Sequence, residues 1–508
     1  MKRILFSFLI LFSASVNAQT GFTVVKDAKP KAYSRMIFGQ FIEHFHRQIY
    51  GGIFEPASPL ADKDGFRTDV INALKELKIP IVRWPGGCFV SSYHWLDGVG
   101  QNRQPAFDKA WGVEDPNTFG TAEFVKWCRL IGAEPYICTN AGTGTPEEMS
   151  DWVEYCNLNI GKYGRLRKAH GFDEPFNVKY WSIGNENWGA FEIGAKSPAE
   201  WAPLVKESAK MMRAADPNVI LLAAATEQET WTLPLLQHAG AWLNYICLHG
   251  YYGGQRSSYN DLIARTEDPE RSIAATVAVL EKAKLRGKVK IAFDEWNPRG
   301  WHHPNFPGGS RPDGGGPNRE ALIKDREKAD INAVYTMADA VFTACFLNTC
   351  LRNCEDVPIA GFSPVVNTRG ALFVHPKGIV KRTTFHVLSM YANLLEKNVL
   401  PVKIHSERIG NVAVMDAVLT CNDERSKFVV AAVNKSPDKA VPLTMDFAAL
   451  TGSVPENVQA VILSSASEND FNDIGAENRV QPVEKTLPVK DGTVEIPPHS
   501  VAVIKAAK

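Results

Sequence analysis

The stretches KYWSIGNENWG at Lys179–Gly189 and IAFDEWN at Ile291–Asn297 decide the fold of this chain. In each, a short apolar run rich in β-forming residues ends at a glutamate, Glu186 in the first and Glu295 in the second. Such runs are typical of buried strands in a parallel sheet. Residues at the carboxyl ends of parallel strands gather at one edge, so the two stretches predict an α/β fold with two carboxylates at that edge.

Working outward, similar runs recur from about residue 35 to residue 396. Eight predicted strands are Ile37–Ile42, Ile81–Trp84, Glu134–Thr139, Val178–Ile183, Val219–Ala224, Tyr245–Leu248, Val289–Phe293 and Ile359–Val365. Amphipathic stretches between and after them predict helices, among them Arg67–Leu77, Ala122–Ile131, Pro146–Asn157, Pro198–Ala215, Pro269–Ala283, Arg326–Leu347 and Thr384–Leu395. Alternating strands and helices in this number predict a (β/α)8 TIM barrel; an open doubly wound sheet is the alternative.

After about residue 398 the pattern changes to short strands separated by turn residues, without helices between them. This pattern predicts a C-terminal β-sandwich of jelly-roll type. The early strand Phe22–Lys26 is expected to join it. The predicted domains are a signal peptide at 1–18, an N-terminal strand segment at 19–34, a catalytic barrel at 35–397 and the β-sandwich at 398–508.

The first residues have the pattern of an export signal. Lys2 and Arg3 precede the apolar run Ile4–Phe12, and small residues at Val16 and Ala18 suit a cleavage site. The apolar run is too short to span a bilayer. We therefore expect an exported protein, periplasmic or secreted, with no membrane span after cleavage.

The amino-acid composition indicates which classes of ligand the protein could bind. The chain carries 56 lysines and arginines against 56 aspartates and glutamates, and no basic stripe that would suit a nucleic acid. A neutral substrate such as a carbohydrate is the simpler expectation. The nine cysteines are an odd number scattered through apolar runs, which predicts no disulfide framework, and Cys350 with Cys354 lacks the second cluster of a structural zinc site.

Other strand ends contribute polar side chains to the same edge. Glu43 follows the first strand, Arg83 lies in the second, and His249 and Tyr251 follow the sixth. Arg83 suits two roles equally, support of a catalytic carboxylate or a structural ion pair. A lone histidine at a strand end is commonly part of the core, but the neighbouring Tyr251 favours substrate contact. The Gly- and Pro-rich loop Asn297–Asn318 is predicted to be a substrate-facing lid rather than a linker.

With these motifs in view, the sequence resembles glycoside hydrolase family 51, whose established activity is mainly that of an α-L-arabinofuranosidase. The resemblance runs across essentially the whole chain after residue 18, in the motifs Phe38–Pro56, Arg83–Gly100, Tyr136–Glu148, Lys179–Gly189, Phe293–Asn297 and Phe362–Gly370. It implies a (β/α)8 barrel followed by a β-sandwich, with catalytic glutamates on strands four and seven. The family often forms hexamers, which makes a homo-oligomer an expectation here.

The resemblance also implies roles for single residues. Glu186 resembles the general acid/base and Glu295 the nucleophile. Asn185 matches the residue that binds the 2-hydroxyl, and Arg83 the arginine that supports the nucleophile. The remaining positions resemble residues that line the pocket for terminal arabinose or, for the tryptophan, stand at its mouth: Glu43, Cys88, His249, Tyr251 and Trp95. One departure is Ser363, where many bacterial members carry a sugar-binding glutamine; Asn367 of the same motif is kept.

The implied reaction is hydrolysis with retention in two steps, and it requires neither a metal nor an organic cofactor. The expected substrate is an arabinose-containing polysaccharide or oligosaccharide, with arabinan, arabinoxylan and pectic side chains left open. Two rivals remain at this point. An endo-glucanase or xylosidase would keep both glutamates on the same barrel, and a non-catalytic carbohydrate-binding protein would keep the barrel alone.

Overall fold

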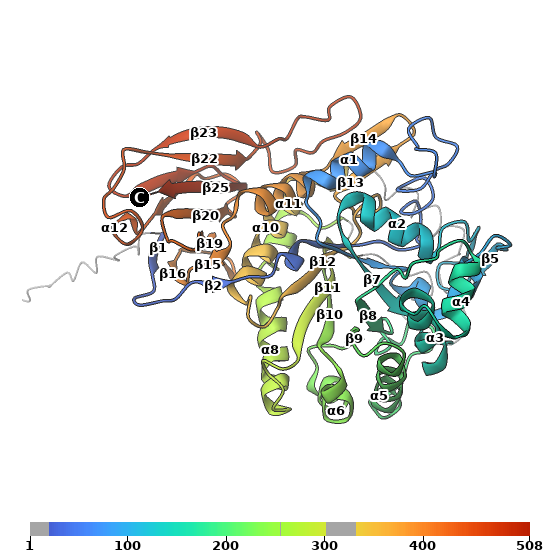
Figure 1. Cartoon of the computed structure of the whole chain (residues 1–508). Coiled ribbons are helices and arrows are strands. Elements are labelled where there is room, and N and C mark those ends of the chain that lie inside the picture. The colour runs from blue at the N-terminus through green and yellow to red at the C-terminus, as the bar shows by residue number, and fades with distance from the viewer. Residues whose placement is uncertain (1–19, 255, 301–331, 508) are drawn as a thin grey trace, which may run out of the picture.

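A closed barrel of eight parallel strands forms the centre of the protein (Figure 1). The structure, a computed structural model, describes residues 20–254, 256–300 and 332–507. In chain order the barrel strands are β3 (Gly39–Phe41), β4 (Ile81–Trp84), β7 (Glu134–Thr139), β8 (Tyr180–Ile183), β9 (Ile220–Ala224), β10 (Tyr245–Gly253), β11 (Lys290–Arg299) and β12 (Ile359–Phe362). The predicted (β/α)8 barrel is confirmed, and the open sheet is excluded by closure between β12 and β3.

Helices follow the barrel strands and pack around them (Figure 1). They are α1 (Thr68–Glu76), α2 (Thr121–Ile131), α3 (Pro146–Asn157), α4 (Gly161–Ala169), α5 (Pro198–Ala215), α6 (Glu229–Ala239), α7 (Tyr259–Ile263), α8 (Asp268–Lys282), α10 (Met337–Arg352) and α11 (Thr383–Leu394). The helices α4, α6 and α7 were not among the helices named from the sequence. The helix expected at Arg326–Leu347 is described from Met337 onward and continues to Arg352, while residues 326–331 lie outside the described residues.

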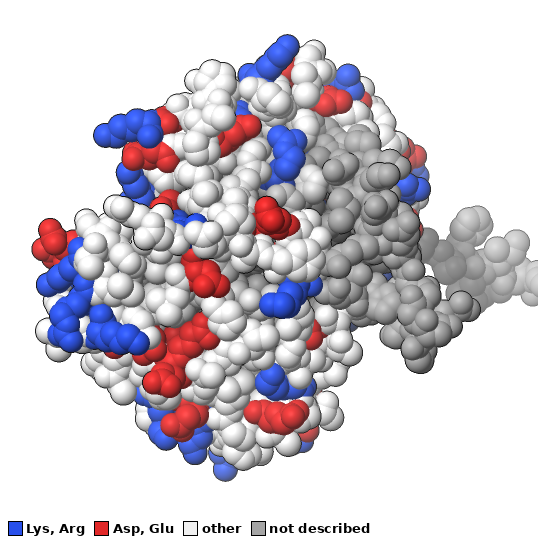
Figure 2. All heavy atoms as spheres, turned by 90° about the vertical axis from the view of Figure 1, so that its right-hand side faces the viewer, with Lys and Arg blue, Asp and Glu red and all other residues white. Residues whose placement is uncertain are grey.

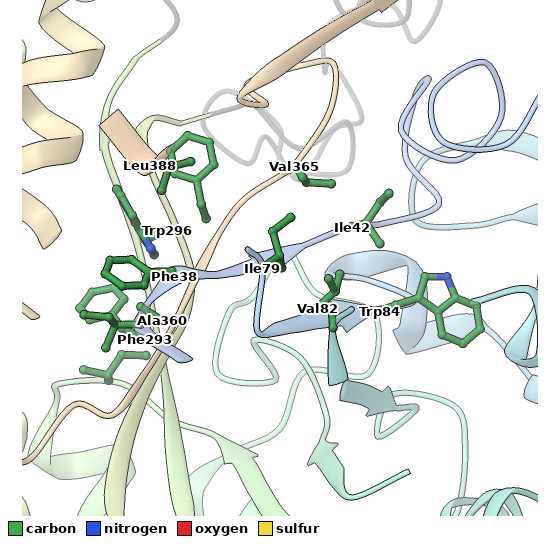
Figure 3. Packing of buried hydrophobic residues seen from close by; sticks show 14 of the residues in the cluster. Phe38, Ile42, Ile79, Val82, Trp84, Phe293, Trp296, Ala360, Val365 and Leu388 are labelled. Atoms are coloured by element: carbon green, nitrogen blue, oxygen red, sulfur yellow. The ribbon is translucent and has the colours of Figure 1, made fainter. Parts of the chain in front are cut away.

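Successive residues of the barrel strands face opposite sides, as the pleat of a strand requires. Ile81 and Ala292 belong to a cluster inside the barrel, whereas their neighbours Val82 and Phe293 pack in the large core outside it. Figure 3 shows this outer packing, in which Trp296 lies beside residues of neighbouring strands. Apolar side chains on both faces of the strands explain the nearly continuous apolar runs in the sequence.

The strands β10 and β11, which carry polar residues of the predicted site, have irregular pairing near these residues. The register between β10 and β11 shifts between Cys247 and His249, and the register between β11 and β12 shifts between Phe293 and Trp296. A bulge inserts a residue on one strand and turns the following side chain. At β11 the shift falls on Asp294 and Glu295, so the positions of both carboxylates depend on it.

The C-terminal part consists of two sheets that enclose a core of their own. One sheet has the order β16-β1-β21-β24 and the other β2-β15-β19-β20-β25-β22-β23. Their strands are β1 (Gly21–Val24), β2 (Lys31–Ala32), β15 (Asn398–Val399), β16 (Val402–His405), β19 (Met415–Cys421), β20 (Lys427–Asn434), β21 (Val441–Thr444), β22 (Asn457–Leu463), β23 (Val483–Pro488), β24 (Thr493–Ile496) and β25 (Ser500–Ala507). The N-terminal strand β1 pairs along its length with β16. The exact domain boundaries stay a prediction.

Smaller elements complete the chain. Three hairpins are formed by β5 (Ala106–Asp108) with β6 (Val113–Asp115), by β13 (Leu372–His375) with β14 (Gly378–Lys381), and by β17 (Arg408–Ile409) with β18 (Val412–Ala413). The short helix α12 is Phe447–Leu450. The 3-10 helices are Arg35–Phe38, Cys88–Ser92, Trp95–Gly98, Gly240–Trp242 and Asn332–Val334. All nine cysteines are buried with free thiols. Among the described residues, no helix is both long and apolar enough to cross a membrane.

The surface is mixed in charge. Figure 2 shows basic and acidic side chains interspersed among uncharged residues on the face turned to the viewer. This distribution agrees with the equal numbers of basic and acidic residues in the sequence.

Candidate active site

The carboxyl ends of the barrel strands surround a cavity of about 370 Å³. Its walls are formed by Glu43, Phe45, Gly87, Cys88, Trp111, Glu186, Trp188, Phe191, His249, Gly250, Tyr251, Glu295 and Arg369. Both glutamates expected from the sequence are among them. The volume suits a small ligand rather than a polymer chain.

Glu295 lies within β11, where two groups donate hydrogen bonds to it and His249 lies nearby. Arg83 Nη1 donates to its Oε2 at 2.6 Å, and the Tyr251 hydroxyl donates to its Oε1 at 2.5 Å. His249 Nδ1 is 3.5 Å from Oε2. Burial alone would raise the pKa of Glu295, but the charges of His249 and Arg83 outweigh it and hold this pKa below the ordinary glutamate value. Glu295 is therefore kept ionised.

Glu186 follows β8 in an unusual backbone conformation. Its φ is +43°, in the left-handed region that non-glycine residues rarely adopt, and the turn also uses Gly184 at φ +71°. Such conformations persist where the surroundings hold a side chain in a fixed direction. His249 Nδ1 lies 2.8 Å from Glu186 Oε1. The turn thus aims the carboxyl group at the histidine and into the cavity.

His249 connects the two glutamates to Asp294. Its Nε2 lies 3.5 Å from Asp294 Oδ1, and Asp294 also accepts a hydrogen bond from the Tyr136 hydroxyl at 2.7 Å. Burial lowers the pKa of His249, yet the charge of Glu295 and the hydrogen bonds to Asp294 and Glu186 raise it to about 10. The imidazole is therefore a cation that can donate from both nitrogens.

Glu186 and Glu295 approach each other closely. One carboxylate oxygen of each lies within 4.8 Å of the other and of a His249 nitrogen. Retaining glycosidases hold their two carboxyl groups about 5–5.5 Å apart, whereas inverting enzymes leave roughly 6.5–9.5 Å for a water molecule. The spacing suits direct attack by a carboxylate on a sugar held between the pair.

Some acidic, histidine and cysteine side chains of the site lie close enough together to be considered as ligands of a metal ion. The trios Glu186–His249–Glu295 and Cys88–Glu186–Glu192 each place one possible ligand atom per residue within 4.8 Å of the others. A metal ligand must be deprotonated. His249 is instead held as a cation, and burial raises the pKa of the Cys88 thiol well above its usual value. In these protonation states His249 has no free lone pair for a metal ion, and Cys88 is a thiol rather than the thiolate that a metal ion binds.

Arg83 makes the contacts that either of its two predicted roles requires, so the choice between the roles stays a prediction. Its Nε lies 3.2 Å from Asp294 Oδ2, a fully buried ion pair, while Nη1 reaches Glu295. Nη2 donates to Asn185 Oδ1 at 2.7 Å. The Asn185 amide in turn donates to Glu192 Oε2 at 3.4 Å. One guanidinium group thus orients Glu295 and Asn185 together.

Glu43 forms the opposite wall of the cavity. Its Oε1 accepts hydrogen bonds from Phe89 N and Trp111 Nε1, both at 2.9 Å. Burial and, after it, the charge of Glu295 raise the pKa of Glu43 to about 8. A Cβ atom on Gly87 would lie 2.6 Å from Glu43 Oε2, so only glycine lets the backbone pass this close. At neutral pH the protonated Glu43 can donate a hydrogen bond into the cavity.

Ser363, the departure from the family pattern, contacts the site through a neighbour. Its hydroxyl lies 2.8 Å from the Tyr251 hydroxyl, which in turn binds Glu295. Asn367 of the same motif is occupied elsewhere, because its amide donates to Arg47 O and its Oδ1 accepts from Val374 N. Asn367 therefore stabilises the backbone around the hairpin β13–β14.

Trp95 does not join the other predicted residues. It is buried and packs against Trp152 and Tyr155, with its indole nitrogen donating to Glu148 O. It is not among the residues that line the cavity. The part of the predicted lid beyond Gly300 lies outside the described residues.

Several residues that line the cavity or lie directly behind its lining were not predicted from the sequence. Trp188 and Arg369 lie within motifs already singled out, Trp188 two positions after Glu186, so their place could have been inferred. Trp111 comes from the hairpin β5–β6, which no strand-end pattern marks. Glu192 is buried behind Asn185, and burial raises its pKa to about 7.

Comparison with known proteins identifies the family. Residues 73–268 match the model of the α-L-arabinofuranosidase 1 domain, and residues 294–500 match that of the α-L-arabinofuranosidase C-terminal domain. An intracellular exo-α-(1→5)-L-arabinofuranosidase of Acetivibrio thermocellus is 32% identical over 84% of this chain and 86% of its own. A family 51 arabinofuranosidase structure from Thermotoga petrophila covers 96% of this chain and 100% of its own, with 31% identity and a TM-score of 0.84. The chain belongs to glycoside hydrolase family 51.

The family 51 assignment settles the class of reaction. The arabinose complex of the Thermotoga maritima α-L-arabinofuranosidase also superposes, with a TM-score of 0.85, 31% identity, and coverage of 96% of this chain and 100% of the other. This family 51 member is therefore a glycoside hydrolase that releases α-L-arabinofuranosyl residues. The endo-glucanase, xylosidase and non-catalytic alternatives are not favoured.

The prediction that this family 51 enzyme is exported, to the periplasm or outside the cell, is contradicted by the relatives. Those from Acetivibrio thermocellus, Halalkalibacterium halodurans and Bacillus subtilis are all named intracellular enzymes. The prediction rested on residues 1–18, which lie outside the described residues. The export signal was inferred only from the order of charged, apolar and small residues at the start of the sequence. The similarity of the rest of the chain to enzymes named as intracellular outweighs this pattern.

Proposed function

We propose that this enzyme is a retaining, exo-acting α-L-arabinofuranosidase in which Glu295 is the nucleophile and Glu186 the general acid/base. The observation that carries the proposal is the asymmetry between the two carboxyl groups. Glu295 receives hydrogen bonds from Arg83 and Tyr251 and has a lowered pKa, whereas Glu186 contacts neither of these donors in the described structure. A nucleophile must be ionised and an acid protonated, so their surroundings must differ in this way.

In the first step an oxygen of Glu295 attacks the anomeric carbon while Glu186 gives its proton to the departing glycosidic oxygen. The C–O bond to the leaving group breaks as the bond to Glu295 forms, which yields a covalent arabinosyl-enzyme. In the second step Glu186 takes a proton from a water molecule that attacks the same carbon and releases Glu295. Two inversions give net retention.

Other residues in and around the cavity bind the sugar or orient the catalytic carboxyl groups. Asn185, to which the family resemblance gives the role of binding the 2-hydroxyl, is buried next to Glu186 and is held by hydrogen bonds to Arg83 and Glu192. The protonated Glu43 and the aromatic side chains of Trp111 and Phe45 form the remaining walls. A cavity of this size encloses one terminal arabinofuranosyl unit, which supports exo action. We propose short α-(1→5)-linked arabino-oligosaccharides as the substrates, since bacterial relatives are named for that linkage.

Two variants test the roles of the glutamates. Glu295→Ala is expected to abolish turnover of an aryl α-L-arabinofuranoside, and added azide is expected to restore release as the glycosyl azide of inverted configuration. Glu186→Ala with azide is expected to give the azide of retained configuration, because azide then attacks the glycosyl-enzyme. NMR of the products separates the two outcomes. Full activity of Glu295→Ala without azide would refute the assignment.

A substrate panel tests the linkage. Hydrolysis of α-(1→5)-L-arabinotriose at a higher kcat/KM than arabinoxylan- or pectin-derived oligosaccharides supports the proposal, and the reverse order contradicts it.

A further inference from the structure

A cavity of about 410 Å³ lies between the barrel and the C-terminal sheets, where α10 runs beside β19 and β20 (Figure 1). Its walls come from α8 and the turn before it, from α10, from residues 404–416 and from Lys435. It shares no lining residue with the cavity of Glu186 and Glu295. It is therefore a separate space, and its volume lies within the roughly 300–1,000 Å³ of small-ligand sites.

The pleat of β20 directs the side chain of Lys435 toward the barrel. Val433 packs in the large core on the barrel side, whereas Ala432 packs between the two sheets. Lys435 extends the strand pairing, because its backbone N–H donates to Val414 O at 2.8 Å. Two positions apart on a strand, Lys435 and Val433 share one face. The Lys435 Nζ accordingly reaches the barrel, where it donates to the Thr266 hydroxyl at 3.3 Å.

Lys435 is a buried cation without a carboxylate beside it. The residue is 2% exposed, and no carboxylate oxygen of the described residues lies within 4.0 Å of its Nζ. The Thr266 hydroxyl donates to Ile263 O and accepts one of the three N–H groups of the ammonium. A buried charge is costly unless it is paired, and the cavity leaves room for an anion at the other N–H groups.

The arginines of the cavity wall differ from Lys435, since each of them contacts a carboxylate. The pairs are Arg352 with Asp416, Arg408 with Glu267 and Arg271 with Asp268. Glu270 lies farther away, with its Oε2 at 3.9 Å from Arg352 Nε. This buried oxygen accepts no hydrogen bond within the described residues. The wall therefore offers an unmatched cation at Lys435 and an unmatched acceptor at Glu270.

We propose that this cavity binds a small phosphate ester, whose phosphate group pairs with Lys435 and whose hydroxyl groups donate to Glu270. A phosphate group has acceptor oxygens for both remaining N–H groups of Lys435. The rest of the ligand is uncharged, because a second anionic group would be repelled by the carboxylates of the wall. Inorganic phosphate carries the same group without the hydroxylated part. Since the walls belong to both the barrel and the sheets, the bound ligand holds the two together.

Isothermal titration calorimetry of the full chain tests the proposal with three probes: glycerol 3-phosphate, inorganic phosphate and neutral glycerol. Glycerol 3-phosphate is expected to bind the wild-type protein, and glycerol to give no measurable binding. Lys435→Met is expected to raise the Kd for glycerol 3-phosphate at least about tenfold, the effect of a lost hydrogen bond between charged groups. Lys403→Met is the matched control and is expected to keep the wild-type Kd, since Lys403 is exposed on β16 and does not line the cavity.

A second variant keeps the test decisive if Lys435→Met does not fold. Ala413→Trp fills the cavity from the side of the sheets while Lys435 stays in place, and it is expected to abolish binding. An unchanged kcat/KM on an aryl α-L-arabinofuranoside shows that a variant is folded. No binding of glycerol 3-phosphate to the wild type, or an equal Kd in Lys435→Met and Lys403→Met, would overturn the proposal. An equal Kd for inorganic phosphate would assign the site to free phosphate and overturn the role of Glu270.

Discussion

Glu43 and Glu295 lie in one cavity, and each affects the charge of the other. Arg83 and His249 keep Glu295 ionised, while burial and the charge of Glu295 raise the pKa of Glu43 to about 8. Two carboxylates that share a site are thus held in different protonation states at neutral pH. Cations surround one of them, and neutral N–H donors bind the other.

Glu43→Gln is expected to retain most of its kcat/KM at pH 7, because an amide keeps both an acceptor for Trp111 and a donor toward the sugar. Glu43→Ala is expected to lose about tenfold or more, the value of at least one hydrogen bond with its partners left unpaired. Steady-state kinetics on one aryl α-L-arabinofuranoside measures both. Equal losses in the two variants would mean that Glu43 acts as a carboxylate.

The pH profile follows from the charge on His249. The acidic limb of kcat/KM marks protonation of Glu295 in the free enzyme, and its lowered pKa places that limb below the ordinary glutamate value. His249→Gln removes the cation that opposes burial most strongly, so the Glu295 pKa rises and the acidic limb moves to higher pH, by about one unit or more. His238→Gln, an exposed change on α6, is the control. A limb that stays in place contradicts this account.

Single residues differ in how far the sequence could predict them. Glu186 and Glu295 stand directly after apolar runs, so strand geometry predicts that both lie at the mouth of the barrel. The direction of each carboxyl group depends further on the turn at Gly184 and on the register shift in β11, which the sequence does not show. Trp95 follows a loop whose path the pattern does not fix, and its ring turns into the core beside Trp152. Trp111 enters the cavity from a hairpin, a long-range contact that no local pattern shows.

At the scale of elements, the eight barrel strands were predictable because both of their faces are apolar. The helix α6 was not named from the sequence; it is shorter than α5, which was predicted although it too contains an internal proline, Pro203. The register shifts at β10 and β11 were also beyond prediction, since they depend on pairing between strands.

The middle of β11 packs closely against β12. A Cβ atom on Gly361 would lie 2.4 Å from the backbone oxygen of Asp294. Gly361→Ala is therefore expected to destabilise the protein by about 1–3 kcal/mol, the usual effect of overpacking, and to lower kcat by displacing Glu295. Thermal unfolding and kinetics measure the two effects. Gly254→Ala is the control, because its nearest contact would be 3.9 Å away; equal behaviour of both variants would contradict the argument.

At the scale of the whole molecule, the first and the last described strands, β1 and β25, both belong to the C-terminal pair of sheets. The strand β1 pairs with β16, which lies about 380 positions later, so the C-terminal sheets include the first described residues. The sequence predicted the short strands of the C-terminal region. Because turn residues and no helices separate these strands, it also favoured a β-sandwich. Which strands pair could not be predicted, because the pairs join distant segments.

Phe22 ties β1 to the core of the C-terminal sheets, where it is buried. Phe22→Ala is expected to lower the free energy of unfolding by about 3–5 kcal/mol. The kcat/KM of the folded enzyme is expected to stay at the wild-type value, because this core contains no residue that lines the cavity of Glu186 and Glu295. Denaturant unfolding and kinetics on the same preparation check both parts. Loss of activity in fully folded Phe22→Ala would show that the sheets act on the site.

Assembly stays a prediction. The resemblance to family 51 implies a hexamer, and light scattering of the full chain tests it: a hexamer supports the prediction and a monomer contradicts it.

Covalent capture tests the central claim, a nucleophilic Glu295 served by Glu186, most directly. With Glu186→Ala and an aryl α-L-arabinofuranoside that has a good leaving group, the first step stays fast while the second slows by about 10²–10⁴-fold, so the glycosyl-enzyme accumulates. After acid quenching, mass spectrometry of peptides is expected to find one pentosyl group on Glu295. A pentosyl group on another residue, or steady turnover with no covalent adduct, would contradict the account.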